Sequence, residues 1–179
     1  MSVSQSAANG NRAARLTRLA LIPLFFILGP RLAGATIFVN SEMAPLAFQA
    51  DTIALGTVRV LSSRWEAGRI VSDAQVELSQ VIKGAAPRTI TVVAAGGKVG
   101  DVAMRVIGGA QFHVGDRSIL FLTAQGGIHR VVGLAAGKLD VFTRRGQQMV
   151  TWPAAGPTGA VPLDTALDQL RTVAQSPRR

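Results

Sequence analysis

The sequence has 179 residues, of which 19 are basic and 10 are acidic, and it contains no cysteine. This length suits one domain of ordinary size, and the absence of cysteine from the sequence excludes disulfides, thiolate metal sites and a lipid-modified cysteine within it. Four arginines and no acidic residue lie in the first 35 positions, which leaves 15 basic against 10 acidic residues and a net charge of about +5. The remaining sequence shows no stripe of basic residues, so a net charge of that size affects solubility more than nucleic-acid binding.

The first 35 residues have the pattern of a secretory signal. Arg12, Arg15 and Arg18 form a basic segment, Leu19–Leu28 form a ten-residue apolar run, and Ala33-Gly34-Ala35 supplies the small-x-small pattern that signal peptidase recognises. A transmembrane helix needs about 20 apolar residues, which is more than this run offers. We therefore predict cleavage after Ala35 and export to the periplasm or the medium. In the alternative, the segment remains as an uncleaved anchor and is the protein's only membrane contact.

Beyond the signal segment, the pattern first predicts a short helix and then two long strands. The helix is expected to start at Ser41-Glu42 and to run through Phe48, with Leu46 and Phe48 packed inward. The strands are expected between Asp51 and Gly84, joined at the segment RWEAGR, where Gly68 supplies a turn of hairpin length.

The first long strand changes its apolar parity. Ile53 and Leu55 occupy odd positions, whereas Val58 and Val60 occupy even ones. Side chains alternate along a regular strand, so the change predicts a β-bulge near Gly56-Thr57, where glycine tolerates unusual backbone angles. In the alternative, the strand is regular and buried on both faces.

The second long strand alternates clearly and is expected to be buried on one face. The buried face holds Ala74, Val76, Leu78 and Ile82 together with Gln80, and the wet face holds Asp73, Gln75, Glu77 and Ser79.

Shorter strands with turn residues between them follow along the chain. They are expected at 89–95, 118–122, 128–134, 138–143 and 148–152, with a Gly-rich turn at 96–100 and a short strand or irregular edge at 104–109. After a Pro- and Gly-rich linker, helical spacing of apolar residues predicts an amphipathic helix with Leu163, Ala166, Leu167, Leu170 and Val173 on its packed face. The whole pattern predicts an all-β antiparallel barrel or sandwich, with a signal peptide at 1–35, a β domain at 36–152, and the linker, helix and tail at 153–179.

Several short motifs resemble those of a known domain. Ala50-Asp51 opens a strand, Val81-Ile82-Lys83-Gly84 closes the next, and Val114-Gly115-Asp116 precedes the Ile119–Leu122 strand. Together they resemble the netrin-like domain of the tissue inhibitors of metalloproteinases. That resemblance implies an oligonucleotide/oligosaccharide-binding (OB) type barrel, here of five to six strands. The inhibitors act through an N-terminal cysteine, so their chemistry does not transfer to a sequence without one.

The chain also resembles a set of small exported bacterial proteins of unknown function. The resemblance rests on Gly115-Asp116-Arg117 with Leu120-Phe121-Leu122, and on Gly133-Leu134 between Val131 and Gly137-Lys138 with Val141 following. It covers roughly residues 36 to 150.

Only His113 and His129 are available as imidazoles. General-base, triad or metal chemistry would have to use them or rely on carboxylates alone. We expect both histidines to be polar residues of strands and turns, and we expect no metal and no cofactor. The alternative is an exported hydrolase or metal-dependent enzyme that uses His113 or His129.

Trp65 lies beside the predicted hairpin turn between charged residues. Arg64, Arg69, Lys98 and Arg105 could share its rim, and these five residues are the candidate binding surface. A tryptophan there either contacts a partner or packs on its own hairpin. We expect an exported, non-enzymatic binding module, for example an accessory protein or inhibitor of a secreted protease. Nucleic acid is not expected as a partner, because the sequence has no tyrosine and its phenylalanines suit a core.

Overall fold

A computed structural model describes residues 43–153 and 159–175. The chain divides into two units, Met1–Ala35 and Thr36–Arg179, and the described residues all belong to the second. The signal-segment predictions, the start of the first helix, residues 154–158 of the linker and the tail from Ser176 fall outside them. The elements in chain order are α1 (Met43–Gln49), β1 (Thr52–Glu66), β2 (Arg69–Lys83), β3 (Thr89–Ala95), β4 (Gly97–Val99), β5 (Val102–Met104), β6 (Arg117–Gln125), β7 (Ile128–Val131), the 3₁₀ turn η1 (Leu134–Gly137), β8 (Lys138–Arg144), β9 (Gln147–Thr151), β10 (Ala160–Pro162) and α2 (Leu163–Gln175).

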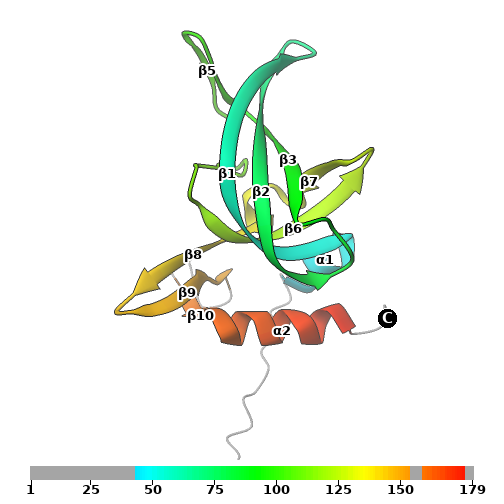
Figure 1. Cartoon of the computed structure of the whole chain (residues 1–179), viewed down its shortest axis with the longest axis vertical. Coiled ribbons are helices and arrows are strands. Elements are labelled where there is room, and N and C mark those ends of the chain that lie inside the picture. Colours follow the sequence, from blue (N-terminus) through cyan, green and yellow to red (C-terminus); the bar gives the residue numbers. More distant parts are fainter. Residues whose placement is uncertain (1–42, 154–158, 176–179) are drawn as a thin grey trace, which may run out of the picture. The chain divides into compact units, whose positions relative to one another are not determined.

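Most of the described chain is strand, as predicted, and two helices accompany the strands (Figure 1). The main sheet has eight strands in the order β1-β2-β3-β7-β6-β8-β9-β10, and β4 and β5 form a separate hairpin. The expectation of five to six strands in an antiparallel sheet is therefore wrong on both counts. The sheet is mixed because β3 and β7 pair in parallel, through Val92 and His129. The added strands come from the β8–β9 hairpin and from β10, which lies in the segment predicted as linker.

β1 pairs with two strands along its first half. Residues 52–57 pair with β6 on one edge, while the whole strand pairs with β2 on the other. The five strands β1, β2, β3, β7 and β6 thus follow one another around a ring of pairings. The ring is not cleanly closed, because the β3–β7 step consists of a single pairing.

The parity change in β1 falls at an irregularity of the β1–β2 pairing, close to the predicted bulge at Gly56-Thr57. The register with β2 shifts between Ile53 and Ala54, between Leu55 and Gly56, and between Val58 and Val60. At the first two places the unpaired residue is on β2, and at the third it is Arg59 on β1. Toward β6 the strand pairs without a shift through Gly56, and it is buried on both faces there, as in the alternative. Gly56 also leaves space between the strands, since an added Cβ would lie 2.6 Å from Val76 and 2.9 Å from Leu78.

The two faces of β1 pack into two separate hydrophobic cores. One core lies within the ring and includes Ala54, Val58, Val76, Val92, Leu120 and Leu122. The other lies between the sheet and the helices and includes Ile53, Leu55, Phe121, Trp152 and the buried face of α2. The predicted buried face of β2 is right for Ala74, Val76 and Leu78, but Ile82 packs against the second core because the register shifts before it.

The helices lie at the end of the fold opposite the β1–β2 turn, with α1 between the strands and α2 (Figure 1). The buried residues of α2 are the five that the spacing predicted: Leu163, Ala166, Leu167, Leu170 and Val173. In α1 the buried residues are Met43 and Ala47. Leu46 is half-buried and packs against the second core, as predicted, whereas Phe48 is half-buried and belongs to neither core.

The motif residues that suggested the resemblance hold these elements together. The ammonium of Lys83 donates to the carbonyls of Ala47 and Ala50, at 2.6 and 2.7 Å, and so caps the end of α1. Gly84 has φ of +75°, and an added Cβ would collide with the carbonyl oxygen of Asp51. The carboxylate of Asp51 in turn accepts a hydrogen bond from the Ala124 backbone N–H, at 3.0 Å.

Candidate functional site

A cleft of about 660 Å³ lies near the free end of the β1–β2 hairpin. Its walls come from β1, β2, the end of β3, the β4–β5 hairpin and the segment 110–113. The volume falls within the range of small-ligand sites, which is about 300–1,000 Å³. Polar lining residues include Ser63, Ser72, Lys98, Arg105, Gln111 and His113.

Two serines fix β4 at the back of this cleft. Ser72 Oγ lies 2.7 Å from the Gly96 carbonyl oxygen and 3.0 Å from Ser63 Oγ. Because a carbonyl only accepts, Ser72 must donate to Gly96, and Ser63 must then donate to Ser72. The Lys98 backbone N–H donates to Ser63 Oγ at 3.4 Å. Both hydroxyl protons are therefore used in anchoring β4, and neither serine is arranged as a nucleophile.

Glycine at position 97 permits this close approach. Its φ is +138°, and an added Cβ would collide with the hydroxyls of both Ser63 and Ser72. The strand β4 therefore crosses the two serines at a distance that any other residue would increase.

Two of the five predicted binding residues line the cleft. Lys98 and Arg105 extend from the β4–β5 region, and within the described residues neither side chain has a hydrogen bond or an ion pair. Arg64 is on the opposite face of the hairpin, where its guanidinium pairs with Asp73 at 2.7 Å and with Glu66 at 2.9 Å. Hydrogen bonds to Asp73 and then Glu66 raise the pKa of Arg64. The predicted rim is therefore split between two faces.

The remaining two candidates sit beside the hairpin turn. Trp65 is 51% exposed and, by strand alternation, lies on the same face as Ser63, which lines the cleft. It stands directly opposite Ile70, which is fully buried. Arg69 is exposed and lies outside the cleft, and its side chain makes no hydrogen bond or ion pair with a described residue.

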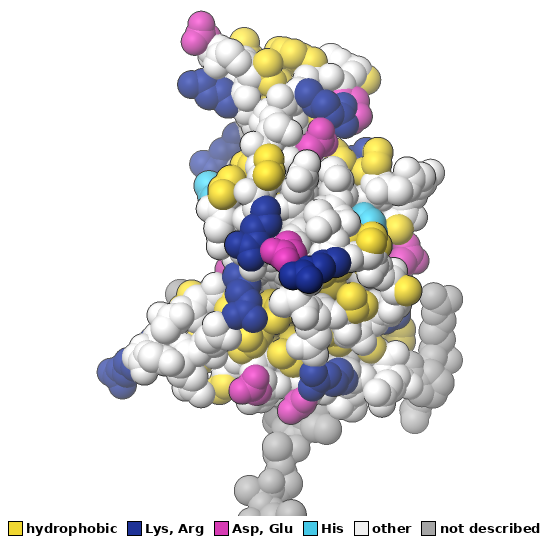
Figure 2. Space-filling model, viewed as in Figure 1, with side chains coloured by type: hydrophobic (Ala, Val, Ile, Leu, Met, Phe, Trp, Pro, Cys, Tyr) yellow, Lys and Arg dark blue, Asp and Glu magenta, His cyan; other side chains and the backbone are white. Residues whose placement is uncertain are grey.

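Figure 2 shows that charged groups are distributed unevenly over the face with β1 and β2. Basic and acidic side chains adjoin one another at the centre of the view. Among the described residues, Glu77 pairs with Arg59 at 2.8 Å and with Arg88 at 2.7 Å. Hydrogen bonds from Arg88 and then Arg59 lower the pKa of Glu77. Near the upper end of the view, basic side chains flank a group of hydrophobic ones.

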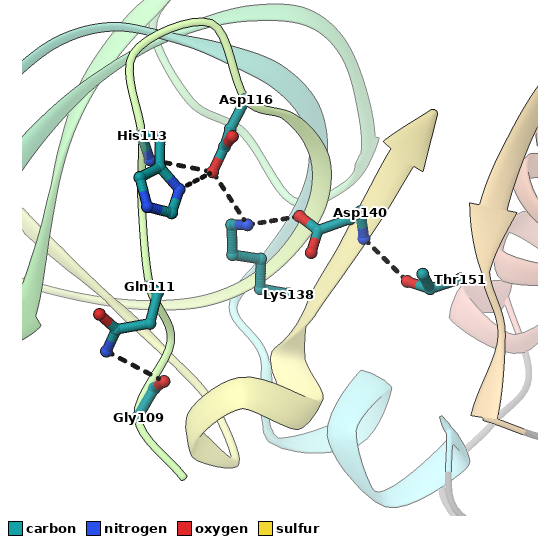
Figure 3. A network of polar contacts seen from close by, with 7 residues as sticks. All are labelled: Gly109, Gln111, His113, Asp116, Lys138, Asp140 and Thr151. Atoms are coloured by element: carbon teal, nitrogen blue, oxygen red, sulfur yellow. Dashed lines mark hydrogen bonds and ion pairs between the residues drawn. The ribbon is translucent and has the colours of Figure 1, made fainter. Parts of the chain in front are cut away.

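His113 lines both the cleft and a second, smaller hollow of about 350 Å³. Its ring Nδ1 is 3.4 Å from the Asp116 carboxylate, and its backbone N–H donates to the same oxygen at 2.9 Å (Figure 3). That carboxylate also faces the ammonium of Lys138 at 3.3 Å. Lys138 additionally pairs with Asp140 and lies 5.5 Å from the centroid of the Phe112 ring.

Asp116 is held in its ionised form. Partial burial by itself would raise the pKa of Asp116, but the backbone N–H of His113 and the charge of Lys138 lower it below its ordinary value. The His113 side chain is 78% exposed. The pair therefore closes the 113–116 turn, in which Asp116 N–H also donates to the His113 carbonyl at 3.0 Å.

His129 is buried on β7, and its Nδ1 has no hydrogen-bond partner among the described residues. No group of three or more His, Asp or Glu side chains in residues 43–153 and 159–175 is arranged to hold a metal ion.

Several cleft residues were missed by sequence reasoning, among them Ser63, Ser72 and Gln111. A signal was available for Ser72, since it precedes Ala74 and Val76 on the buried face of β2 and so places a hydroxyl in an apolar row. The position of Ser63 depends on the extra residue at Arg59, which the sequence pattern did not reveal.

A scan against protein-family models gives no match for this chain. A search of curated proteins gives none either. Within the described part of the chain, no helix combines the length and the apolar character needed to cross a membrane.

Proposed function

We propose that this protein is an exported, non-enzymatic binding module whose contact surface is the cleft beside the β1–β2 hairpin. The observation that carries the proposal is the presence of two cations, Lys98 and Arg105, in a cleft of ligand size without partners in the described structure. Fixed charges without internal partners are available to a ligand, whereas Arg64 is already occupied by Asp73 and Glu66.

An OB-like barrel is the proposed architecture of this module. Its support is the pairing of β1 with both β2 and β6, together with the parallel pairing of β3 with β7. Barrels of this class carry their ligands on an exposed sheet face and its adjoining loops. The cleft lies at such a place, between β2, β3 and the β4–β5 hairpin.

Export is proposed on the pattern of residues 12–35, and the class of partner follows from it. An exported binding module meets exported proteins, and the resemblance described above favours a secreted protease that it assists or inhibits. Mass spectrometry of the protein from periplasm or medium should give a chain that begins at Thr36. A chain that still begins at Met1 contradicts cleavage.

Affinity capture from the native culture fluid tests the binding function. The wild-type protein should retain a partner at physiological salt, and Lys98→Ala/Arg105→Ala should retain less of it. The matched control is Arg144→Ala/Arg145→Ala, which removes the same charge from the exposed β8–β9 turn. A partner held equally by all three proteins places the contact outside the cleft, and no partner at all contradicts the binding function.

The second candidate is a hydrolase or metal-dependent enzyme, and the His113–Asp116 contact is the observation that favours it. A general base needs a carboxylate that orients its imidazole. Here the same carboxylate oxygen also receives the backbone N–H of His113 and the ammonium of Lys138. Turnover of any substrate that is lost in His113→Ala, while the melting temperature is kept, would favour the enzyme over the binding module.

A further inference from the structure

The cleft has an excess of positive charge. None of its lining residues is acidic, whereas Lys98 and Arg105 are cationic and His113 adds an imidazole. Four acids on neighbouring elements are paired elsewhere: Glu66 and Asp73 with Arg64, and Asp116 and Asp140 with Lys138. Asp101, in the β4–β5 turn, is exposed and does not line the cleft. A ligand that complements this surface must therefore carry negative charge.

The same cleft also has an apolar component. Leu61, Met104 and Phe112 line it together with three alanines, Ala94, Ala95 and Ala110. An inorganic anion would use the two cations and leave these side chains exposed to water. A ligand with both carboxylates and small apolar groups would cover both parts of the lining.

An open strand edge adjoins the cleft. The Gly96 N–H donates to the Ile70 carbonyl at 2.8 Å, so Gly96 faces β2. The residue before it, Ala95, then directs its own N–H and C=O to the other edge of β3, because these groups alternate along a strand. On that edge the described chain pairs with β3 only at Val92, and Ala95 is exposed. Unpaired edges of this kind accept extended peptides as an added strand.

We propose that the cleft binds an extended acidic peptide segment of a partner protein, which lies along the Ala95 edge of β3, with its carboxylates toward Lys98 and Arg105. This inference rests on the proposed binding function and names the chemistry of the ligand. Backbone hydrogen bonds to β3 would align the segment, and small apolar side chains between its acids would meet Leu61, Met104 and Phe112.

Fluorescence anisotropy with the full-length protein tests the inference. The probe is a fluorescein-labelled eight-residue peptide that alternates aspartate with valine, and the matched probe replaces every aspartate by asparagine. The acidic probe should bind at least about tenfold more tightly than the neutral one, because charge-assisted hydrogen bonds are the stronger class. Higher salt should weaken the acidic probe. Equal affinity of the two probes, or no binding of either, overturns the inference.

Protein variants locate the site. Lys98→Ala/Arg105→Ala should weaken the acidic probe by about tenfold or more, while Arg144→Ala/Arg145→Ala should leave it within about twofold. The replaced residues of both double variants are on the surface, and a thermal melt of each variant checks that it is folded. An equal loss in the two variants means general charge attraction and overturns the inference.

The backbone contribution is tested on the peptide, so that the protein is unchanged. N-methylation of alternate peptide bonds in the acidic probe removes the donors that strand addition needs, and its affinity should fall by about tenfold. Inorganic phosphate and polygalacturonate supply anions without a peptide backbone. Each is compared with unlabelled peptide at the same concentration of negative charge. If either then displaces as much probe as the peptide does, the site is an anion site and the peptide inference is wrong.

These outcomes are separable from failure of the proposed function. A partner captured from culture fluid that is indifferent to Lys98→Ala/Arg105→Ala and to the acidic peptide overturns the inference and leaves the binding function standing. If no partner is captured and the peptide does not bind, both are wrong.

Discussion

The ammonium of Lys138 lies 3.3 Å from the Asp116 carboxylate, and the side chain of this lysine is only 7% exposed. A second carboxylate, from Asp140, completes its neutralisation, and Phe112 presents its ring at 5.5 Å. The contacts join the 113–116 turn to β8, two segments that sequence reasoning had treated separately (Figure 3).

Replacing the lysine should therefore destabilise the fold. Lys138→Met keeps the aliphatic bulk but leaves two carboxylates beside each other without their shared cation, and we expect a loss of about 2–3 kcal/mol in the free energy of unfolding. Urea denaturation measures it. The double variant Lys138→Met/Asp116→Asn should lose less free energy of unfolding than the two single variants add up to. Strictly additive losses would contradict the pairing.

The same ion pair predicts a pH dependence. The pKa of Asp116 is lowered in the folded protein relative to its value of about 3.9 in an unfolded chain. The ionised carboxylate thus contributes stability that is present above that unfolded value and is lost as the pH falls through the folded pKa. The stability advantage of the wild type over Asp116→Asn should be constant from about pH 5 to pH 6 and should shrink below about pH 4.

Denaturation curves of the two proteins over this range provide the measurement. Asp168→Asn is the control, because the Asp168 carboxyl pairs with Arg171 on the exposed side of α2 and is 73% exposed. It should change stability by less than about 0.5 kcal/mol. An advantage of the wild type over Asp116→Asn that grows on acidification would show that the sign is wrong.

A third prediction concerns the space that Gly56 leaves between β1 and β2. An alanine Cβ there would lie 2.6 Å from Val76 and 2.9 Å from Leu78, inside the core of the ring. Gly56→Ala should cost about 1–3 kcal/mol, and Gly56→Val should cost more. Ser62→Ala, an exposed change on the same strand, is the control. Thermal melts that rank valine as milder than alanine would contradict a steric cause.

Gly56 also illustrates what the sequence pattern could and could not supply. The glycine and the parity change correctly marked an irregular position, since the register with β2 shifts between Leu55 and Gly56. The pattern could not show that the strand is also buried on both faces there, because that burial depends on the pairing of residues 52–57 with β6, which lies 60 to 70 positions away in the chain. By contrast, the boundaries of β3 and the buried face of α2 depend on local alternation and helical spacing, and both were predicted correctly.

The candidate site was predicted less completely, for a related reason. Lys98 and Arg105 were singled out by charge, and they reach one cleft because β4 crosses Ser63 and Ser72. Arg64 was grouped with them because it adjoins Trp65 in the sequence, but strand alternation places it on the other face, where Asp73 pairs with it. Recognising that separation requires the register after Arg59, which depends on the β1–β2 pairing.

The β1–β2 turn offers a fourth prediction, one of increased stability. Ala67 and Gly68 have φ of +46° and +74°, and the flanking residues Glu66 and Arg69 pair directly, so the connection is a two-residue turn with both central residues left-handed. Alanine is strained there, whereas asparagine tolerates the conformation. Ala67→Asn should raise the free energy of unfolding by about 0.5–1 kcal/mol. Ala67→Val, which is β-branched, should lower it, and a reversed order in thermal melts would contradict the turn assignment.

The last prediction concerns His129, whose imidazole sits at the single pairing between β3 and β7. It is 8% exposed, and its Nδ1 has no partner in the described structure, so the ring places an unsatisfied polar atom beside Val92. Removing such an atom while keeping the apolar volume relieves a desolvation penalty. His129→Leu should therefore leave the free energy of unfolding unchanged or raise it by up to about 2 kcal/mol. Val92→Ala, which opens a cavity at the partner position, should lower it by about 1–3 kcal/mol.

If His129→Leu is instead destabilising by more than about 1 kcal/mol, the imidazole makes a stabilising hydrogen bond, for example to water. If His129→Leu keeps its stability but loses a measurable turnover, the ring has a chemical role and the binding-module proposal is wrong.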